Sequence, residues 1–183
     1  MITQIEATIE DLYHIPEHGK AELVNGEIIL MPSCGFLPNR GAANVYLSLR
    51  RHEPLVPSGF ACTDNIGYIV NLPNRKSFSP DASFFIGPPS GMKFLHGAPV
   101  FAVEVRSEND YGPAAERAMA DKRRDYFAAG ARGVWDVDLQ SDEVIKSYDC
   151  QNPEQPTIYR RADTAHAELA LPGWEFPVDE LFS

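Results

Sequence analysis

The alternation of apolar and polar residues predicts a β-hairpin close to the start of the chain. Residues 20–24 and 27–31 are each typical of a short strand, and Asn25-Gly26 between them suits a two-residue type I′ turn. Glu22 lies on the first of these strands. We therefore expect an N-terminal hairpin that carries an acidic side chain on its first strand.

Capping residues and apolar positions spaced three and four apart predict three helices. A short helix begins after Thr8, because Thr8 and Asp11 stand in the positions of a capping box. A second runs from about residue 39 to 53, and a third from about residue 113 to 129, where Gly130 stops it. The apolar stripe of the second helix consists of Ala42, Val45, Tyr46 and Leu49.

Apolar runs rich in β-branched and aromatic residues predict the strands of a central sheet. Residues 60–72 and 78–86 are expected to form two strands, and residues 99–107 and 133–139 two more. Because the helix at 113–129 lies between the last two strands, they should be parallel and joined by a right-handed crossover.

These elements indicate an α/β (α+β) fold, in which helices flank a mixed central sheet and the hairpin is added at the N-terminal end. With 183 residues, the chain is expected to form a single domain over residues 1–183. Its content of 44% hydrophobic and 23% charged residues is typical of a globular protein. The first ten residues do not resemble a signal peptide, no apolar run could span a membrane, and the three cysteines are scattered, so we expect a cytoplasmic protein.

Glu104 interrupts the apolar run at 99–107. Glutamate is almost never fully buried without a partner, since an unpaired buried carboxylate is costly or takes up a proton. Glu104 therefore requires either a basic side chain or a metal ion beside it, unless this side of the strand is exposed.

Lys122 lies at the centre of the core-facing side of the third predicted helix. At about 100° per residue, it falls among the apolar residues of that face, which are Ala115, Ala118, Met119, Tyr126 and Ala129. A lysine in this place either extends its ammonium to solvent or directs it at a buried anion. Because the helix should pack on the sheet that carries Glu104, that carboxylate is a ready partner.

Asp81 begins the strand that precedes the Glu104 strand in the chain. Two carboxylates on adjacent strands are a common way to hold Mg²⁺, a hard cation that prefers oxygen ligands. Bound there, such a cation could polarise a phosphoryl oxygen and lower the pKa of a bound water, while Lys122 orients that water or stabilises developing charge. Arg106 is a poor general base but could contact phosphate.

The segments Ser79-Pro80-Asp81 and Glu104-Val105-Arg106-Ser107 resemble the PD-(D/E)XK nuclease signature, with arginine in place of its lysine. More closely, the chain resembles the Uma-type family of restriction-endonuclease-like proteins over about residues 5–180. Further matching segments are residues 21–28, 64–68, 82–84, 122–130 and 135–138. One departure is the sequence 39–41, Asn-Arg-Gly, where the family often has a histidine.

This resemblance implies a restriction-endonuclease-like core and a divalent metal, Mg²⁺ or Mn²⁺. In the family the lysine has moved from the strand to the helix, which makes Lys122 its carrier. The implied catalytic residues are Asp81, Glu104 and Lys122. The implied metal ligands are Asp81, Glu104, the backbone carbonyl of Val105 and Glu22, and the implied substrate-binding residues are Arg106 and Ser107.

The net charge of −10 argues against a protein that binds nucleic acid through a wholly basic surface. Local basic patches are still available at residues 50–51, 122–124 and 160–161. The expected function is metal-dependent hydrolysis of DNA by a homodimer. The alternative is a catalytically silent nuclease-fold module that binds nucleic acid or a protein, and a weaker one is a small-molecule hydrolase.

Overall fold

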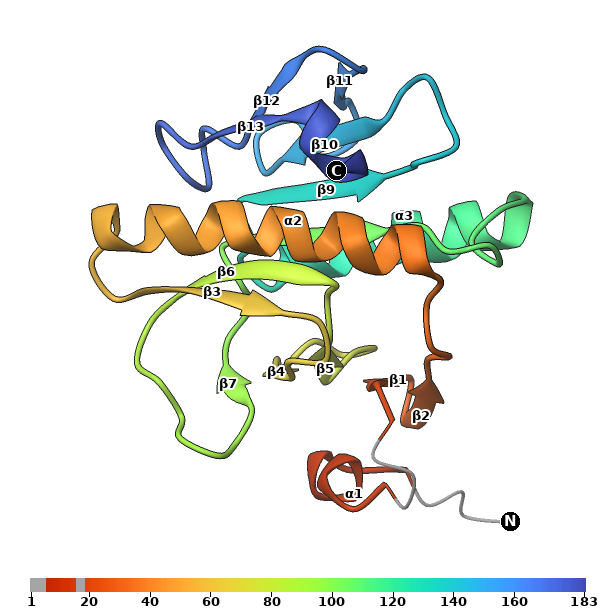
Figure 1. The fold of residues 1–183 in the computed structure, drawn as a ribbon. Coiled ribbons are helices and arrows are strands. Elements are labelled where there is room, and N and C mark those ends of the chain that lie inside the picture. Colours follow the sequence, from red (N-terminus) through yellow and green to blue (C-terminus); the bar gives the residue numbers. More distant parts are fainter. Residues whose placement is uncertain (1–5, 16–18) are drawn as a thin grey trace.

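The computed structural model describes residues 6–15 and 19–183, and its centre is a six-stranded mixed sheet (Figure 1). Its strands lie in the order β11-β10-β9-β8-β6-β3. Their bounds are Gly59–Thr63 (β3), Ala82–Ile86 (β6), Phe101–Val105 (β8), Gly133–Val137 (β9), Ile145–Asp149 (β10) and Thr157–Tyr159 (β11). Only β8 and β9 pair in parallel, and the other pairs are antiparallel.

Helices lie on the two faces of this sheet, α2 (Phe36–His52) in front of it and α3 (Pro113–Ala128) behind it in Figure 1. Alternate residues of β8 face the two sides, as the pleat requires. Phe101, Val103 and Val105 pack in the core on the α2 side, whereas Ala102 packs with Tyr126 of α3. The alternation places Glu104 on the α3 side. The predicted parallel β-α-β unit and the two longer helices are confirmed.

The N-terminal hairpin consists of β1 (Ala21–Val24) and β2 (Glu27–Leu30). Asn25 and Gly26 have φ angles of 50° and 75°, the positive values that a type I′ turn needs. The short helix α1 (Ile9–Tyr13) precedes the hairpin, and its capping box between Thr8 and Asp11 is formed as expected. Both sequence predictions are therefore confirmed.

The strand predicted at residues 60–72 is wrong in its length, because the chain turns after β3. Asp64 accepts a hydrogen bond from the backbone of Asn65, and Asn65 has a φ of 67°. The chain then enters a separate three-stranded sheet in the order β5-β4-β7. Its strands are β4 (Tyr68–Ile69), β5 (Ser77–Phe78) and β7 (Leu95–His96). The single strand predicted at residues 78–86 is therefore wrong as well, because β5 and β6 are separate strands in different sheets.

The C-terminal part closes the core on the α2 side of the sheet. It contains β12 (Thr164–His166), β13 (Glu175–Pro177) and a short 3-10 helix at Val178–Phe182. Trp135 and Trp174 are buried against each other with ring centroids 5.1 Å apart, as their predicted core role requires. In the part of the chain that the structure describes, no helix is long and apolar enough to cross a membrane.

The last strand of the sheet order, β3, has an outer edge that a side chain covers. The backbone N–H of Ala61 donates to a carboxylate oxygen of Glu53 at 2.7 Å. Glu53 lies in a short 3-10 helix (Glu53–Leu55) directly after α2, and Arg50 of α2 holds its other oxygen. The outward N–H at the middle of this edge is thereby satisfied within the chain.

Candidate active site

Asp81 and Glu104 meet because their strands are neighbours in the sheet. Asp81 directly precedes β6, which pairs with β8, and its backbone N–H donates to the carbonyl of Val103 at 3.1 Å. The backbone N–H of Val105 donates to the Asp81 carboxylate at 2.7 Å. This bond fixes the orientation of Asp81 beside the end of the strand that carries Glu104.

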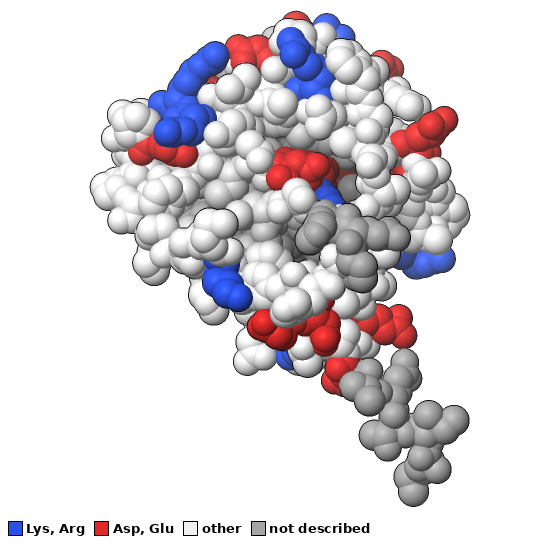
Figure 2. Space-filling model, turned by 60° about the horizontal axis from the view of Figure 1, so that its bottom comes forward, with Lys and Arg blue, Asp and Glu red and all other residues white. Residues whose placement is uncertain are grey.

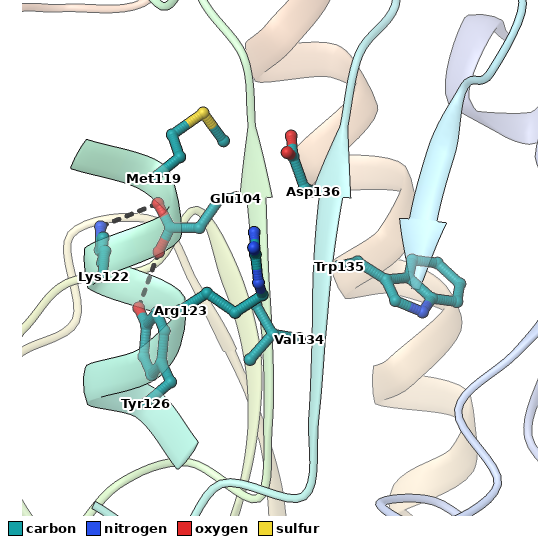
Figure 3. Close-up of a pocket in the computed structure, with 8 residues that line it drawn as sticks. All are labelled: Glu104, Met119, Lys122, Arg123, Tyr126, Val134, Trp135 and Asp136. Carbon is teal, nitrogen blue, oxygen red and sulfur yellow. Dashed lines mark hydrogen bonds and ion pairs between the residues drawn. The ribbon is translucent and has the colours of Figure 1, made fainter. Parts of the chain in front are cut away.

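Glu104 is bonded to two side chains of α3 (Figure 3). The Nζ of Lys122 lies 2.8 Å from Oε2 of Glu104, and the hydroxyl of Tyr126 donates to Oε1 at 2.7 Å. Lys122 therefore points at a partly buried carboxylate rather than out to solvent, in agreement with one of the two sequence-based alternatives. Tyr126 is fully buried and stacks on Phe78 with ring centroids 4.0 Å apart.

Glu22 enters the same cluster from the N-terminal hairpin. Its carboxylate is buried, lies 2.8 Å from Nζ of Lys122 and accepts a 2.8 Å hydrogen bond from the backbone of Ser79. Arg75 pairs with its other oxygen and also with Asp125 of α3. Lys122 thus bridges the two glutamates, and Glu22 lies where the family resemblance implied an acidic residue of the site.

Lys20 is a site residue that the sequence analysis did not identify. Its Nζ lies 2.5 Å from Asp81 and 2.7 Å from Asp64. The signal in the sequence is its spacing, because Lys20 stands two residues before Glu22 in an extended segment and so shares its side of the chain. The site therefore contains two lysines, one on each carboxylate of the predicted pair.

The electrostatics of the cluster follow from burial and from these pairs. Burial raises the pKa of Glu104, and the negative charges of Asp81 and Glu22 act in the same direction. Burial also acts on Glu22, but Lys122 and Arg75 outweigh it and hold the pKa of Glu22 below its usual value. For Lys122, burial is outweighed by Glu104 and Glu22, which raise its pKa. Lys122 is therefore an ammonium at neutral pH.

The donor set of this cluster fits a hard divalent cation. Five carboxylates are connected here, and they face three cations, so two negative charges remain in excess when all are ionised. The carboxylates are Glu22, Asp64, Asp81, Glu104 and Asp125, and the cations are Lys20, Arg75 and Lys122. Among residues 6–15 and 19–183, no three His, Cys, Asp or Glu side chains are already arranged around one point as metal ligands. Instead, Lys20 and Lys122 contact the carboxylate oxygens of Asp81 and Glu104 that a metal ion would use.

A small cavity of about 30 Å³ lies beside this cluster, between α3 and β9. Eight residues line it, all labelled in Figure 3: Glu104, Met119, Lys122, Arg123, Tyr126, Val134, Trp135 and Asp136. The volume is that of one or two water molecules. The accessible lining of the cavity is mostly apolar, so it is a packing void beside Glu104 and Lys122 rather than a hydrated site.

Arg106 lies at the end of β8 and is occupied by two carboxylates. Its guanidinium donates to both oxygens of Asp136, at 2.8 and 2.7 Å, and also pairs with Glu116 in the first turn of α3. Only 3% of the Arg106 side chain is exposed. The backbone of Ser107 donates to Asp110 at 2.7 Å. Substrate contact by Arg106 or Ser107 stays a prediction, and the observed contacts of Arg106 join β8, β9 and α3.

Comparison with known proteins agrees with this fold. The sequence model of the Uma2 family, described as “Putative restriction endonuclease”, matches residues 8–179. A crystal structure of a “putative nuclease belonging to DUF820” from Anabaena variabilis superposes with a TM-score of 0.74, at 15% sequence identity, over 96% of this chain and 97% of that one. No curated protein matches. The family model covers nearly the whole chain and confirms the resemblance seen in the sequence. The chain therefore belongs to the Uma2 family.

Proposed function

We propose that this protein is a metal-dependent endonuclease that hydrolyses phosphodiester bonds in DNA. The observation that carries the proposal is the convergence of Asp81, directly before β6, Glu104, near the end of β8, and Lys122, inside α3. Membership of the Uma2 family supports it independently.

In this proposal Asp81 and Glu104 hold one Mg²⁺ or Mn²⁺, together with the backbone carbonyl of Val105, and Glu22 is a further ligand. The cation would polarise the phosphoryl oxygen and activate a water. Lys122 is held as an ammonium by two glutamates, so its role is to stabilise charge on the phosphate or to orient the water, and not to remove a proton.

The hydrogen bonds around the two ligands have a positioning role in this proposal. The backbone of Val105 orients Asp81, and Tyr126 orients Glu104. Such outer contacts fix the direction in which a carboxylate presents its free lone pairs. Arg106 and Ser107 are assigned to the substrate side, at the end of the same strand.

A catalytically silent module that binds nucleic acid or a protein is the second candidate, and the surface charge favours it. Basic side chains are scattered over the face shown in Figure 2 rather than gathered in a patch. At the predicted basic sites, exposed arginines pair with carboxylates of the chain itself. These pairs are Arg50 with Glu53, Arg124 with Asp121, Arg160 with Glu143 and Arg161 with Asp179.

The deciding experiment is cleavage of supercoiled, linear and single-stranded DNA in Mg²⁺ or Mn²⁺, with EDTA as the metal-free control. We expect the parent to cleave with metal, Asp81→Ala to be inactive, and Asp138→Ala, which lies outside the cluster, to be active. A chromogenic phosphodiester measures small-molecule hydrolysis in parallel. Intact DNA in every metal, with DNA still bound, would favour the silent module.

We also propose that the protein acts as a two-fold dimer, since two sites related by symmetry match the two strands of a duplex. Light scattering should give about twice the chain mass of 20.3 kDa. A mass near 20.3 kDa across a wide concentration range would show a monomer instead.

A further inference from the structure

Lys20 is the cation closest to the predicted metal ligand Asp81, and nothing in the family resemblance assigns it a role. Its Nζ lies 2.5 Å from Oδ1 of Asp81, the oxygen that is not bonded to the backbone of Val105. In the proposed function, that oxygen is the one that the backbone leaves free for a metal ion. An ammonium and a divalent cation at this short distance from one oxygen would repel each other strongly.

Asp64 is a second ion-pair partner that Lys20 can keep when it leaves Asp81. The Asp64 carboxylate lies 2.7 Å from the same Nζ and follows β3, whereas Asp81 precedes β6. Burial lowers the pKa of Lys20, but Asp81, Glu104 and Asp64 outweigh this and raise it, so the ammonium keeps its charge with either partner. An ammonium has three donors, and two of them meet Asp64 and Asp81.

We propose that Lys20 is a substrate-binding residue that exchanges partners when the metal binds. Before metal binds, Lys20 neutralises Asp81. When a divalent cation takes Asp81, Lys20 remains on Asp64 and presents its freed donors to a phosphate oxygen of the substrate. This inference rests on the proposed function, because it requires a metal ion on Asp81 and a phosphate next to it.

The proposal predicts effects of opposite sign for one substitution, Lys20→Met. Metal binding should become tighter, because a competing cation is removed from Asp81. Binding of the phosphate substrate should become weaker, because a charged hydrogen-bond donor is lost. If Lys20 only supported the hairpin, Lys20→Met would disorder the site and weaken both the binding of metal and the binding of substrate.

The matched control is Lys76→Met, which removes the same charge from the neighbouring segment. The Nζ of Lys76 contacts the carbonyl of Leu72 at 2.8 Å and the side chain of Asn71 at 3.2 Å, and its backbone pairs with Leu23 of the hairpin. A general effect of net charge would appear equally in both variants. Lys20→Arg keeps the charge and should resemble the parent in substrate binding.

The first test is calorimetric titration of the full chain with Mg²⁺ alone. The second is the binding of a short DNA duplex in the presence of Ca²⁺, a cation that binds the same kind of oxygen ligands as Mg²⁺. For Lys20→Met we expect about tenfold tighter Mg²⁺ binding and about tenfold weaker duplex binding, each a factor typical of one hydrogen bond to a charged group. Lys76→Met should change each by less than about twofold.

Equal or weaker Mg²⁺ binding by Lys20→Met, or unchanged duplex binding, would overturn the inference. If the parent binds Mg²⁺ but does not cleave DNA, the proposed function fails. The affinities of Lys20→Met for Mg²⁺ and for the duplex still show in that case whether Lys20 exchanges partners. If neither protein binds Mg²⁺, both proposals fail.

Discussion

Glu22 and Glu104 share one cation, because the Nζ of Lys122 lies 2.8 Å from a carboxylate oxygen of each. The first glutamate comes from the N-terminal hairpin and the second from the central sheet. One ammonium therefore connects three parts of the chain that are far apart in sequence. Its loss should affect both the stability of the fold and the chemistry of the site.

Lys122→Met is expected to separate these two roles. In EDTA it should lower the free energy of unfolding by roughly 3–5 kcal/mol, because the buried Glu22 and the partly buried Glu104 lose their shared partner. Added Mg²⁺ should recover part of this loss, since a divalent cation supplies positive charge to the same oxygens. Cleavage should fall by about a hundred- to a thousandfold, the usual effect of removing one charge stabiliser.

Denaturant unfolding with EDTA and with Mg²⁺, beside a cleavage assay, measures both effects. Arg117→Met, on the exposed side of the same helix, is the control and should change neither. A large loss of stability that Mg²⁺ does not reverse, together with unchanged cleavage, would exclude a catalytic role for Lys122.

Tyr126→Phe removes the hydrogen bond to Glu104 and keeps the stacking on Phe78. The lost bond involves a charged acceptor, so we expect a cost of about 1.5–3 kcal/mol in stability. Metal affinity should fall by about 10- to 100-fold, the usual effect of removing a contact that orients a ligand.

Tyr68→Phe is the matched control for Tyr126→Phe. Tyr68 is equally buried, and its hydroxyl lies 2.8 Å from the hydroxyl of Ser83. This variant should lose about 1 kcal/mol of stability and retain parental metal affinity. If calorimetry gave the two variants the same metal affinity, Tyr126 would have only a structural role.

Glu116→Gln should reveal a pH-dependent contribution of the contact between Arg106 and α3. The hydrogen bond from Arg106 lowers the pKa of Glu116 from its usual value near 4.5. The unfolded chain therefore binds more protons at this group, and the contribution is present above pH 4.5 and lost as the pH falls through the lower folded value.

Because half of the Glu116 side chain is exposed, solvent screening should limit the contribution to less than about 1 kcal/mol at pH 7. Urea unfolding of the parent and of Glu116→Gln between pH 3 and 7 measures the difference. The difference should shrink below pH 4.5, and a difference that grew there would contradict this account.

The binding of DNA should depend only weakly on salt, because four of the five exposed arginines at the predicted basic sites pair with carboxylates of the chain. With fewer than about four phosphates neutralised, the slope of log K against log salt should be shallower than about −3.5. Duplex binding in Ca²⁺ at several salt concentrations measures it. A slope near −6 or steeper would contradict this expectation.

Much of the site could be predicted because its signals are local. The Asn25-Gly26 pair predicted the hairpin, and the helical phase of Lys122 placed it on the core-facing side, with a carboxylate partner as one of two alternatives. Glu104 was recognisable as a charge within an apolar strand. Each of these features depends on a few consecutive residues and on the period of one element.

The other contacts of the site depend on how segments that are distant in the sequence pack together. No local sequence pattern predicts that packing. Lys20 reaches Asp81 only because the hairpin packs on β5, shortly before Asp81 in the chain. Arg106 pairs with Asp136 because β8 and β9 are parallel and in register, with Glu104 opposite Asp136. The strand predicted at 60–72 failed at Asp64, where a side-chain hydrogen bond and a positive φ at the next residue start a turn.

The carboxylate of Glu53 has a consequence for how two copies of the protein can associate. Strands at the margin of a sheet invite pairing with another molecule through their open N–H and C=O groups. At the margin formed by β3, the N–H of Ala61 is already bonded, and a second chain arriving there would have to displace a charged group that Arg50 also holds. Pairing of two copies through the β3 edge is thereby discouraged, so the proposed two-fold dimer is expected to use another part of the surface.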